Sequence, residues 1–312
     1  MPKVLISDAM DNIAQKILSE NNIEVDVKTD LSFDELIDKI KIYDGLIIRS
    51  ATKVTKEVIE KAKNLKIIGR AGAGVDNIDL TSAKEKNIIV MNTPGGNTNA
   101  TAEHTLALLM SLSRRIPEAD ATTHKGNWLK KSLKGNEIKG KKIGIIGFGN
   151  VGKRFAEICN LLKLEVMIFS KYFETIKDDF PQYISSDFKS ILKEADIISL
   201  HCKPNADGSS IITNKEIQLM KSNVLIINTA RGNLVSESDL YEALNNNKIK
   251  GAALDVFGIE PAKENILFGL QNIILTPHIA ASTSEAQIVV AEMIANQFVD
   301  YFISNKVNNS VI

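Results

Sequence analysis

The sequence predicts an α/β protein made of two doubly wound, parallel-sheet domains. Short runs of β-forming residues alternate with helical patterns from the first residues onward, which is typical of a parallel sheet covered by helices. The alternation begins again after about residue 140, at a turn rich in glycine. The 312 residues are also enough for two domains with a hydrophobic core each.

The predicted strands are apolar runs bounded by polar residues or glycine. In the first half they cover residues 3–8, 23–29, 43–50, 65–70 and 87–92, with helices at 33–43 and 56–65 between them. In the second half they cover 142–147, 165–170, 195–200, 223–229, 251–256 and 272–277. Each half therefore has its own set of alternating elements.

Two longer helical segments accompany these units. Residues 97–126 follow the turn-forming PGGN stretch and are predicted as one long helix that crosses into the second unit. Apolar residues recur in it at helical spacing, at Ala102, Leu106, Leu109 and Leu112. A second apolar helix, at 285–303, follows the last strand.

The segment Lys141–Gly152 has the pattern of a dinucleotide-binding turn. Gly147, Gly149 and Gly152 follow a β run at GxGxxG spacing, and an amphipathic helix and another strand come next. The first glycine allows a tight turn, the second lets the backbone approach a pyrophosphate, and the third lets the helix pack closely. The same pattern alone also fits an ordinary loop. With its strand and helix context, it predicts a dinucleotide site at the positive end of the helix.

Composition argues against several classes of function. Lys and Arg total 38 and Asp and Glu total 38, so nothing marks a nucleic-acid or membrane-surface binder, while a local site for a small anion stays open. We find no secretory signal pattern and no apolar run approaching the roughly 18 residues of a membrane span, and we expect a cytoplasmic protein. Cys159 and Cys202 predict neither a disulfide framework nor a metal site, and packing roles are expected.

Residues at the carboxyl ends of the strands are the candidates for chemistry. Ligands of doubly wound sheets bind there, and we expect them in a cleft between the two units. The polar or glycine residues at these ends are Arg49 and Ser50, Gly72 to Gly74, Arg231, Asp255 and His278. Beside a dinucleotide, an arginine, a histidine and a carboxylate suit hydride transfer to or from a 2-oxo or 2-hydroxy acid.

Arg231 and His278 have the chemistry that this reaction needs. The planar guanidinium of Arg231 can hold a carboxylate or keto oxygen through two hydrogen bonds. His278 can exchange a proton with the alkoxide near neutral pH. A carboxylate that accepts a hydrogen bond from the ring nitrogen facing away from the substrate would fix the tautomer of His278 and raise its basicity. Glu260 is a candidate for this carboxylate.

Sequence pattern alone leaves these roles open. His201 also ends a strand and has nearly the same claim to be the base, whereas His104 in a helix and His124 in a polar connection suit structural roles. An alternative interpretation of Arg231 is a surface salt bridge, and an alternative interpretation of Glu260 is a solvated acidic residue in a loop.

The chain resembles the D-isomer-specific 2-hydroxyacid dehydrogenases over essentially its whole length. The resemblance implies a Rossmann dinucleotide-binding domain at 99–287 and a discontinuous, flavodoxin-like substrate-binding domain at 1–98 plus 288–312. The segments that carry it are IIRSATKVT at 47–55, IIGRAGAGVDNIDL at 67–80, NTPGGNTNATAEHT at 92–105, GIIGFGNVGK at 144–153, INTARGNLV at 227–235, ALDVFGIEP at 253–261 and LTPHIAAST at 275–283.

The resemblance also implies roles for individual residues. It places the catalytic arginine on Arg231, the histidine-supporting glutamate on Glu260 and the acid/base on His278. The implied cofactor contacts are Ala73, Gly147, Gly149, Asn150, Val151, Gly152, Cys202, Thr229, Ala230, Arg231, Asp255, His278, Ala280 and Ala281. The implied substrate contacts are Gly72, Ala73, Gly74 and Asn97 at the carboxylate, and Arg49 and Ser50 at a phosphate.

A lysine two residues after a tryptophan reaches into the neighbouring subunit's site in the family members that act on phosphoglycerate. Trp128 and Lys130 match this pattern, which implies a homodimer. Lys130 alternatively is one of several lysines of a surface stretch.

Three departures from the family pattern have consequences. Ser170 and Lys171 replace the acidic residue that normally meets the adenosine ribose, so we expect a weaker NAD preference and use of NADP(H), unless Lys171 is simply solvated. The family usually has proline two residues after the histidine at position 201, whereas this chain has Lys203 there and Pro204 next. We expect Lys203 to be an exposed loop residue. The chain ends soon after residue 303, so we expect no carboxyl-terminal regulatory domain.

The activity implied by the resemblance is NAD(P)-dependent oxidation of 3-phospho-D-glycerate to 3-phosphohydroxypyruvate in serine biosynthesis. One alternative is another member of the family, such as a glyoxylate or hydroxypyruvate reductase. A different class of function is a dinucleotide-sensing binding protein, similar to the corepressors related to these dehydrogenases. The presence of Arg231, Glu260 and His278 together favours an enzyme.

Overall fold

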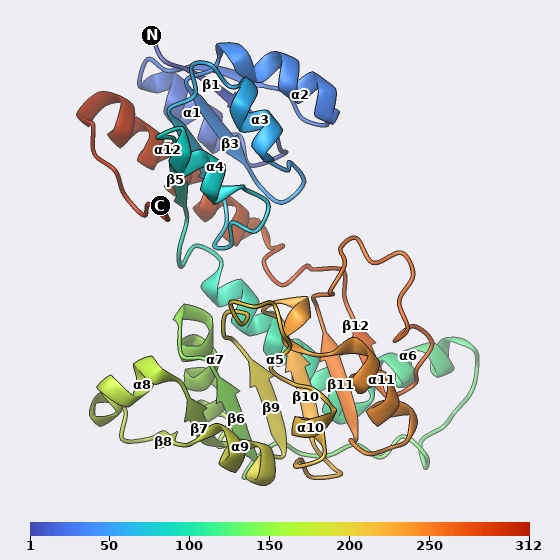
Figure 1. Ribbon diagram of the computed structural model, residues 1–312. Helices are drawn as coiled ribbons and strands as arrows, with labels where there is room; N and C mark the ends of the chain where they lie inside the picture. Colours follow the sequence, from blue (N-terminus) through green and yellow to red (C-terminus); the bar gives the residue numbers. More distant parts are fainter. The chain divides into compact units, whose positions relative to one another are not determined.

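The chain folds into two compact units, and the first is built from both ends of the chain. A computed structural model describes residues 1–312. The first unit contains Met1–Asn97 and Ser282–Ile312, and the second contains Thr98–Ala281. Figure 1 shows the last helix, in red, among the blue amino-terminal elements. The carboxyl-terminal part of the first unit begins at Ser282. The boundary at residue 288 implied by the resemblance lies inside the last helix, which begins at Ser284 and stays with one unit as a whole.

The first unit contains a five-stranded parallel sheet in the order β2-β1-β3-β4-β5. This is the strand order of flavodoxin-like folds. The central strand β3 is buried along its whole length, as expected for a strand covered on both faces. The strands are β1 (Lys3–Ile6), β2 (Glu24–Val27), β3 (Gly45–Ile48), β4 (Ile67–Arg70) and β5 (Ile89–Asn92).

Helices cover both faces of this sheet. One face packs against α2 (Phe33–Lys39), η1 (Ile40–Ile42), α3 (Lys56–Lys61) and α4 (Leu80–Glu85), and the other against α1 (Ile13–Glu20) and α12 (Ser284–Ser304). The ring of Phe298 in α12 lies so close to the sheet that a Cβ at Gly69 would be 2.4 Å from it. Only glycine leaves room for this ring, so Gly69 lets the last helix pack directly on the sheet of the first unit.

The second unit contains a seven-stranded parallel sheet in the order β12-β11-β10-β9-β6-β7-β8. This is the Rossmann order with one strand added at the β12 edge. The two-residue strand β8 was not predicted, since it is too short to give a periodic signal. The strands are β6 (Lys142–Ile146), β7 (Glu165–Phe169), β8 (Ile184–Ser185), β9 (Ile197–Leu200), β10 (Leu225–Asn228), β11 (Gly251–Leu254) and β12 (Ile273–Leu275).

The second sheet is also covered on both faces, which confirms the predicted fold class of two doubly wound α/β units. One core lies under α9 (Phe188–Glu194), α10 (Asn214–Ile217) and α11 (Glu237–Asn245). The other lies under α5 (Thr98–Arg114), α7 (Asn150–Leu161) and α8 (Lys171–Ile176). The remaining helical segments are α6 (Ile116–His124), η2 (Lys177–Asp179) and η3 (Gly232–Leu234). None of the helices is both long and apolar enough to cross a bilayer.

The single long helix predicted for residues 97–126 is wrong, because the segment contains two helices. Helix α5 ends at Arg114, and Arg115 has a left-handed backbone with φ of 54° before α6 begins. Pro117 explains the break, since proline has no N–H and its ring clashes with the carbonyl four residues earlier. That carbonyl, on Ser113, accepts instead from the backbone N–H of Asn136 at 2.9 Å.

Candidate active site

The glycine turn between β6 and α7 is shaped to receive an anion. Gly147 has φ of 102°, and a Cβ on it would be 2.5 Å from the carbonyl oxygen of His201. A Cβ on Gly152 would be 2.2 Å from the Gly147 oxygen, so α7 packs directly on the turn. Gly149, in contrast, faces open space at the start of α7. This arrangement fits a pyrophosphate, because Gly149 leaves it room beside the positive helix end.

Ser170 lies at the end of β7, where the family usually has an acid. Its side chain caps α8 by accepting from the N–H of Phe173 at 3.4 Å. Lys171 next to it is exposed. No carboxylate therefore follows β7 at the position where one would repel a 2′-phosphate.

His278 and Glu260 form a hydrogen-bonded pair in the second unit. Nδ1 of His278 lies 2.6 Å from Oε2 of Glu260, and the other carboxylate oxygen accepts from the N–H of Phe257 at 3.0 Å. The His278 side chain remains 46% exposed, so its second ring nitrogen is accessible to a ligand. His278 has a left-handed backbone with φ of 55°, a conformation that an ordinary residue keeps only where its surroundings hold it.

The charges around His278 favour its protonated form. The hydrogen bond to Glu260 raises the pKa of His278, against burial and the nearby positive charge of Arg231, which lower it. Burial raises the pKa of Glu260, but the hydrogen bonds from His278 and from the Phe257 N–H outweigh it and leave the pKa below its usual value. Glu260 therefore stays a carboxylate that supports a charged His278.

We expect the change Glu260→Gln to move the pH dependence of substrate oxidation. A histidine expected to act as base in oxidation must be neutral, so the rate should rise as pH passes upward through the pKa of His278, which Glu260 raises. Without the carboxylate that pKa falls, and the rise shifts to lower pH with a reduced plateau. The measurement is kcat/KM across about pH 5 to 9. An unmoved or upward-shifted rise would contradict the pairing.

Arg231 and Asp255 are held near this pair by different contacts. Nη1 of Arg231 donates to the Ala230 carbonyl at 2.7 Å, and the carbonyl of Arg231 accepts from the Asn228 side chain at 2.8 Å. Asp255 is fully buried and accepts from the N–H groups of Ile279 and Ala280 at 2.9 and 2.8 Å. Asp255 thus fixes the loop that carries His278.

The two strand-end histidines lie in different surroundings. Burial lowers the pKa of His201 to about 3, and its Nε2 lies 2.8 Å from the Ser199 hydroxyl. An imidazole that stays neutral and whose Nε2 meets a neighbouring hydroxyl is a poor acid/base for a substrate, so His278 is the candidate. Cys202 follows His201 and is half-buried, and burial raises the pKa of its thiol to about 11, so it stays neutral.

The remaining predicted cofactor contacts of this unit lie at strand ends or at the glycine turn. Thr229 is buried and its hydroxyl lies 2.8 Å from that of Thr105 in α5. Ala280 is buried as well, and Asn150 is exposed. Partly exposed positions are Val151, Ala230 and Ala281.

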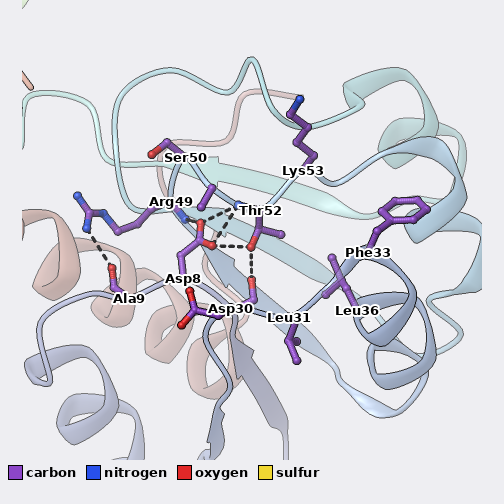
Figure 2. Close-up of a pocket in the computed structure, with 12 residues that line it drawn as sticks. Asp8, Ala9, Asp30, Leu31, Phe33, Leu36, Arg49, Ser50, Thr52 and Lys53 are labelled. Carbon is purple, nitrogen blue, oxygen red and sulfur yellow. Dashed lines mark hydrogen bonds between the residues drawn. The ribbon is translucent and has the colours of Figure 1, made fainter. Parts of the chain in front are cut away.

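A pocket of about 460 Å³ lies at the carboxyl ends of the strands in the first unit, and Arg49 and Ser50 line it. Figure 2 shows the Asp8 carboxylate pointing at the loop that carries Arg49 and Thr52. Asp8 accepts from the N–H of Arg49 at 2.6 Å and from the hydroxyl of Thr52. On another side, the Asn77 side chain donates to the carbonyls of Arg49 and Thr52, both at 2.7 Å. The backbone of this loop is therefore fixed, while the Arg49 guanidinium donates to the Ala9 carbonyl at 3.0 Å and Arg49 stays partly exposed.

The loop Gly72 to Gly74 is braced in a similar way. Arg70 donates to the Gly74 carbonyl and Asn92 donates to the Ala73 carbonyl, both at 2.6 Å. A Cβ on Gly72, which has φ of 159°, would be 2.8 Å from the Arg70 side chain. The bracing side chains Asp8, Asn77, Arg70 and Asn92 were missed by the sequence reasoning. Arg70 and Asn92 end β4 and β5, and Asp8 lies two residues after β1, so the strand-end rule points to these three. Asn77 has no such signal.

Three predicted residues lie at the surface. Trp128 is 82% exposed, and Lys130 and Lys203 are exposed too. Asn97 is partly exposed at the end of the PGGN turn, just before α5. The structure of one chain brings neither Trp128 nor Lys130 to the His278 pair through a described contact.

These features agree with the comparisons with known proteins. Residues 106–280 match the model of the D-isomer specific 2-hydroxyacid dehydrogenase, NAD binding domain. The chain is 42% identical to hydroxypyruvate reductase of Thermotoga maritima over 91% of this chain and 93% of the relative. The chain belongs to the D-isomer specific 2-hydroxyacid dehydrogenase family and carries its NAD-binding domain, which confirms the resemblance.

Among individual relatives, the chain is 41% identical to D-3-phosphoglycerate dehydrogenase of Archaeoglobus fulgidus over 99% of its own length. It spans 59% of the length of that relative. An acyclic imino acid reductase in complex with NADPH and D-Arg superposes with a TM-score of 0.88 at 33% identity, covering 99% of this chain and all of that one. The NAD⁺-bound 3-phosphoglycerate dehydrogenase of Entamoeba histolytica gives 0.84 at 28%, covering 100% of this chain and 98% of that one.

Proposed function

We propose that this chain is an NAD(P)-dependent D-3-phosphoglycerate dehydrogenase, which oxidises 3-phospho-D-glycerate to 3-phosphohydroxypyruvate in serine biosynthesis. The observation that carries the proposal is the His278–Glu260 pair at 2.6 Å, close enough to Arg231 for its charge to act on His278. The Archaeoglobus relative and others of the same name, at similar identity, support the choice of substrate.

The residues of the chain divide the work of the reaction. His278 takes the proton of the C2 hydroxyl in oxidation and returns it in reduction, while Glu260 stabilises the imidazolium. Arg231 holds the substrate carboxylate and polarises the oxygen through its planar fork. The glycine turn at Gly147, Gly149 and Gly152 would hold NAD⁺, which would supply the acceptor for the hydride from C2. Thr229, Ala230, Asp255 and the loop His278 to Ala281 are proposed to line its nicotinamide half.

Residues of the first unit are proposed to bind the rest of the substrate. The backbone of Gly72 to Gly74 and the Asn97 side chain hold the carboxylate, with Ala73 also touching the cofactor. Arg49 and Ser50 bind the phosphate. The rigid bracing of both loops supports this role, because an ordered loop loses little entropy when a ligand binds.

The test of this proposal is the initial rate of NADH oxidation with 3-phosphohydroxypyruvate, hydroxypyruvate and glyoxylate. We expect kcat/KM for the phosphorylated acid to exceed the others by about 100-fold, since a bound phosphate adds charge-assisted hydrogen bonds. A preference for either unphosphorylated acid would contradict this activity and identify the enzyme as a hydroxypyruvate or glyoxylate reductase.

The 42% identity to the Thermotoga hydroxypyruvate reductase, which is matched over 93% of its length, makes that reductase activity the second candidate. A dinucleotide-sensing binding protein is the third. It would bind cofactor without any substrate-dependent change in nicotinamide absorbance, so the same rates distinguish it from an enzyme.

We further propose that the enzyme uses NADP(H) as well as NAD(H). Ser170 leaves the end of β7 without a carboxylate, and Lys171 supplies a cation beside it. The proposal fails if kcat/KM with NADP(H) is below about a hundredth of that with NAD(H), a gap of about 2.7 kcal/mol.

The change Ser170→Asp is expected to lower the NADP(H)-to-NAD(H) ratio of kcat/KM by about tenfold or more, because a new negative charge repels the 2′-phosphate. Ser170→Asn is the matched control. Both substituents are good helix N-caps, so the cap on α8 is kept and only the charge differs. Equal ratios for the two variants would show that the residue does not face the ribose.

A homodimer in which Lys130 of the partner subunit reaches the substrate is also proposed. Trp128 and Lys130 are exposed in the single chain, as an interface segment requires. Lys130→Ala is expected to lower turnover by about tenfold or more, as for a lost charged hydrogen bond.

Mixing inactive His278→Asn protein with Lys130→Ala protein tests the sharing of sites. Each mixed dimer has one site with an intact His278 and an intact lysine from the other subunit. Random exchange should restore activity toward about a quarter of the wild-type sites. No gain over the separate proteins after verified exchange would contradict the arrangement.

A further inference from the structure

His104 on α5 contacts the network that holds the His278 loop. Its Nε2 lies 3.2 Å from the hydroxyl oxygen of Thr276 and 3.4 Å from Oδ1 of Asp255. Helix α5 packs against β11 and β12, at whose ends Asp255 and Thr276 lie. The His104 side chain is 18% exposed and Asp255 is fully buried, so these contacts lie largely away from water.

The donors and acceptors of this network fix the direction of each hydrogen bond. The hydroxyl of Thr276 donates to Oδ1 of Asp255 at 2.6 Å. Its oxygen is then left as an acceptor, and the other neighbour of His104 is a carboxylate oxygen. Nε2 of His104 must therefore carry the proton and donate, because neither neighbour has a hydrogen to give it.

Asp255 connects this network to the catalytic loop. Its two oxygens accept from the N–H groups of Ile279 and Ala280, the residues that directly follow His278. His278 has φ of 55° and depends on its surroundings to stay there. Burial raises the pKa of Asp255, but the hydrogen bonds from His104, Thr276 and the loop outweigh it and keep the carboxylate ionised.

We propose that His104 is a positioning residue for the reaction, which donates a hydrogen bond to the Asp255–Thr276 pair and so holds the loop that carries His278. The inference rests on the proposed dehydrogenase function. Without the Nε2 donor, a buried carboxylate oxygen and a hydroxyl oxygen lose a partner, and the strained loop relaxes. Displacements of about 1 Å in an active site can cost about 100-fold in rate.

The experiment compares His104→Phe with His104→Gln in the 312-residue chain. Phenylalanine fills the space and removes the donor, whereas the amide nitrogen of glutamine can take the place of Nε2. We expect kcat to fall about 10- to 100-fold in His104→Phe, with cofactor Kd within about threefold of wild type, and to recover to within about threefold in His104→Gln. His124→Phe, at an exposed histidine of α6, is the matched control and should match wild type.

A double-mutant comparison separates positioning from general damage. If His104 acts through His278, His104→Phe should cause little further loss of the residual turnover in a His278→Asn background, because both changes affect one unit. Thr276→Val replaces His104→Phe in this test if the latter does not fold. It removes the hydroxyl between His104 and Asp255, leaves the histidine in place and should lower kcat in the same way.

Three results would overturn the inference. They are a wild-type kcat in His104→Phe, a loss in His104→Gln as large as in His104→Phe, and an equal factor lost in the His278→Asn background. Wild-type protein with no turnover on any 2-oxo acid would instead overturn the proposed function, so the two failures are distinguishable.

Discussion

Replacing His278 with asparagine is expected to lower kcat by about 10²- to 10⁴-fold, the usual contribution of a general acid/base. Asparagine tolerates a left-handed backbone, and its amide nitrogen can still donate to Glu260, so the loop and its hydrogen bond are preserved. Only the ability to exchange a proton is lost. Steady-state kinetics measure the fall in kcat, and a fluorescence titration with NADH measures cofactor affinity.

Cofactor affinity should remain within about threefold of wild type, because the glycine turn and Asp255 are unchanged. His124→Asn serves as the control for loss of a histidine elsewhere. Retention of more than about a tenth of wild-type kcat in His278→Asn would remove His278 as the acid/base.

The change Arg49→Ala is expected to discriminate between substrates. Loss of a charged hydrogen bond costs about 1.5–3 kcal/mol, so kcat/KM for 3-phosphohydroxypyruvate should fall roughly 10- to 150-fold. Hydroxypyruvate has no phosphate and should lose less than about threefold. The loop should keep its shape, because Asp8 and Asn77 bond to the backbone of residue 49 rather than to its side chain.

Lys53→Ala is the matched control for this prediction, since it removes a cation that lines the same pocket of the first unit. It should affect both substrates by less than about threefold. Equal losses on the two acids in Arg49→Ala would remove the phosphate assignment and leave Arg49 as a general contributor to the fold.

The parallel sheets were predictable because buried strands are continuous apolar runs, and β3 and β9 are buried at every residue. The break at Arg115 was missed although Pro117 signalled it, because apolar residues at helical spacing preceded it. Strand β8 has only two residues and depends on its neighbour β7 for its existence. Local pattern cannot reveal an element that forms only on pairing.

The site was only partly predictable for a similar reason. The strand-end rule selected both His201 and His278, and the difference between them is burial and a partner 18 residues away in sequence, which are tertiary properties. Family resemblance chose Glu260 and His278, while the residues alone left alternatives open. The link from His104 to Asp255 spans two elements far apart in sequence, so no spacing rule could have shown it.

The proposed reaction moves a hydride between C2 of a phosphorylated D-2-hydroxy acid and a nicotinamide, with His278 as the acid/base. The most direct test is to incubate the protein with NAD⁺ and 3-phospho-D-glycerate deuterated at C2, and to examine the reduced cofactor by mass spectrometry. We predict that the deuterium appears in the nicotinamide ring, and that the His278→Asn protein forms this product about 10²- to 10⁴-fold more slowly. A wild-type protein that yields no deuterated cofactor from this substrate would contradict the claim.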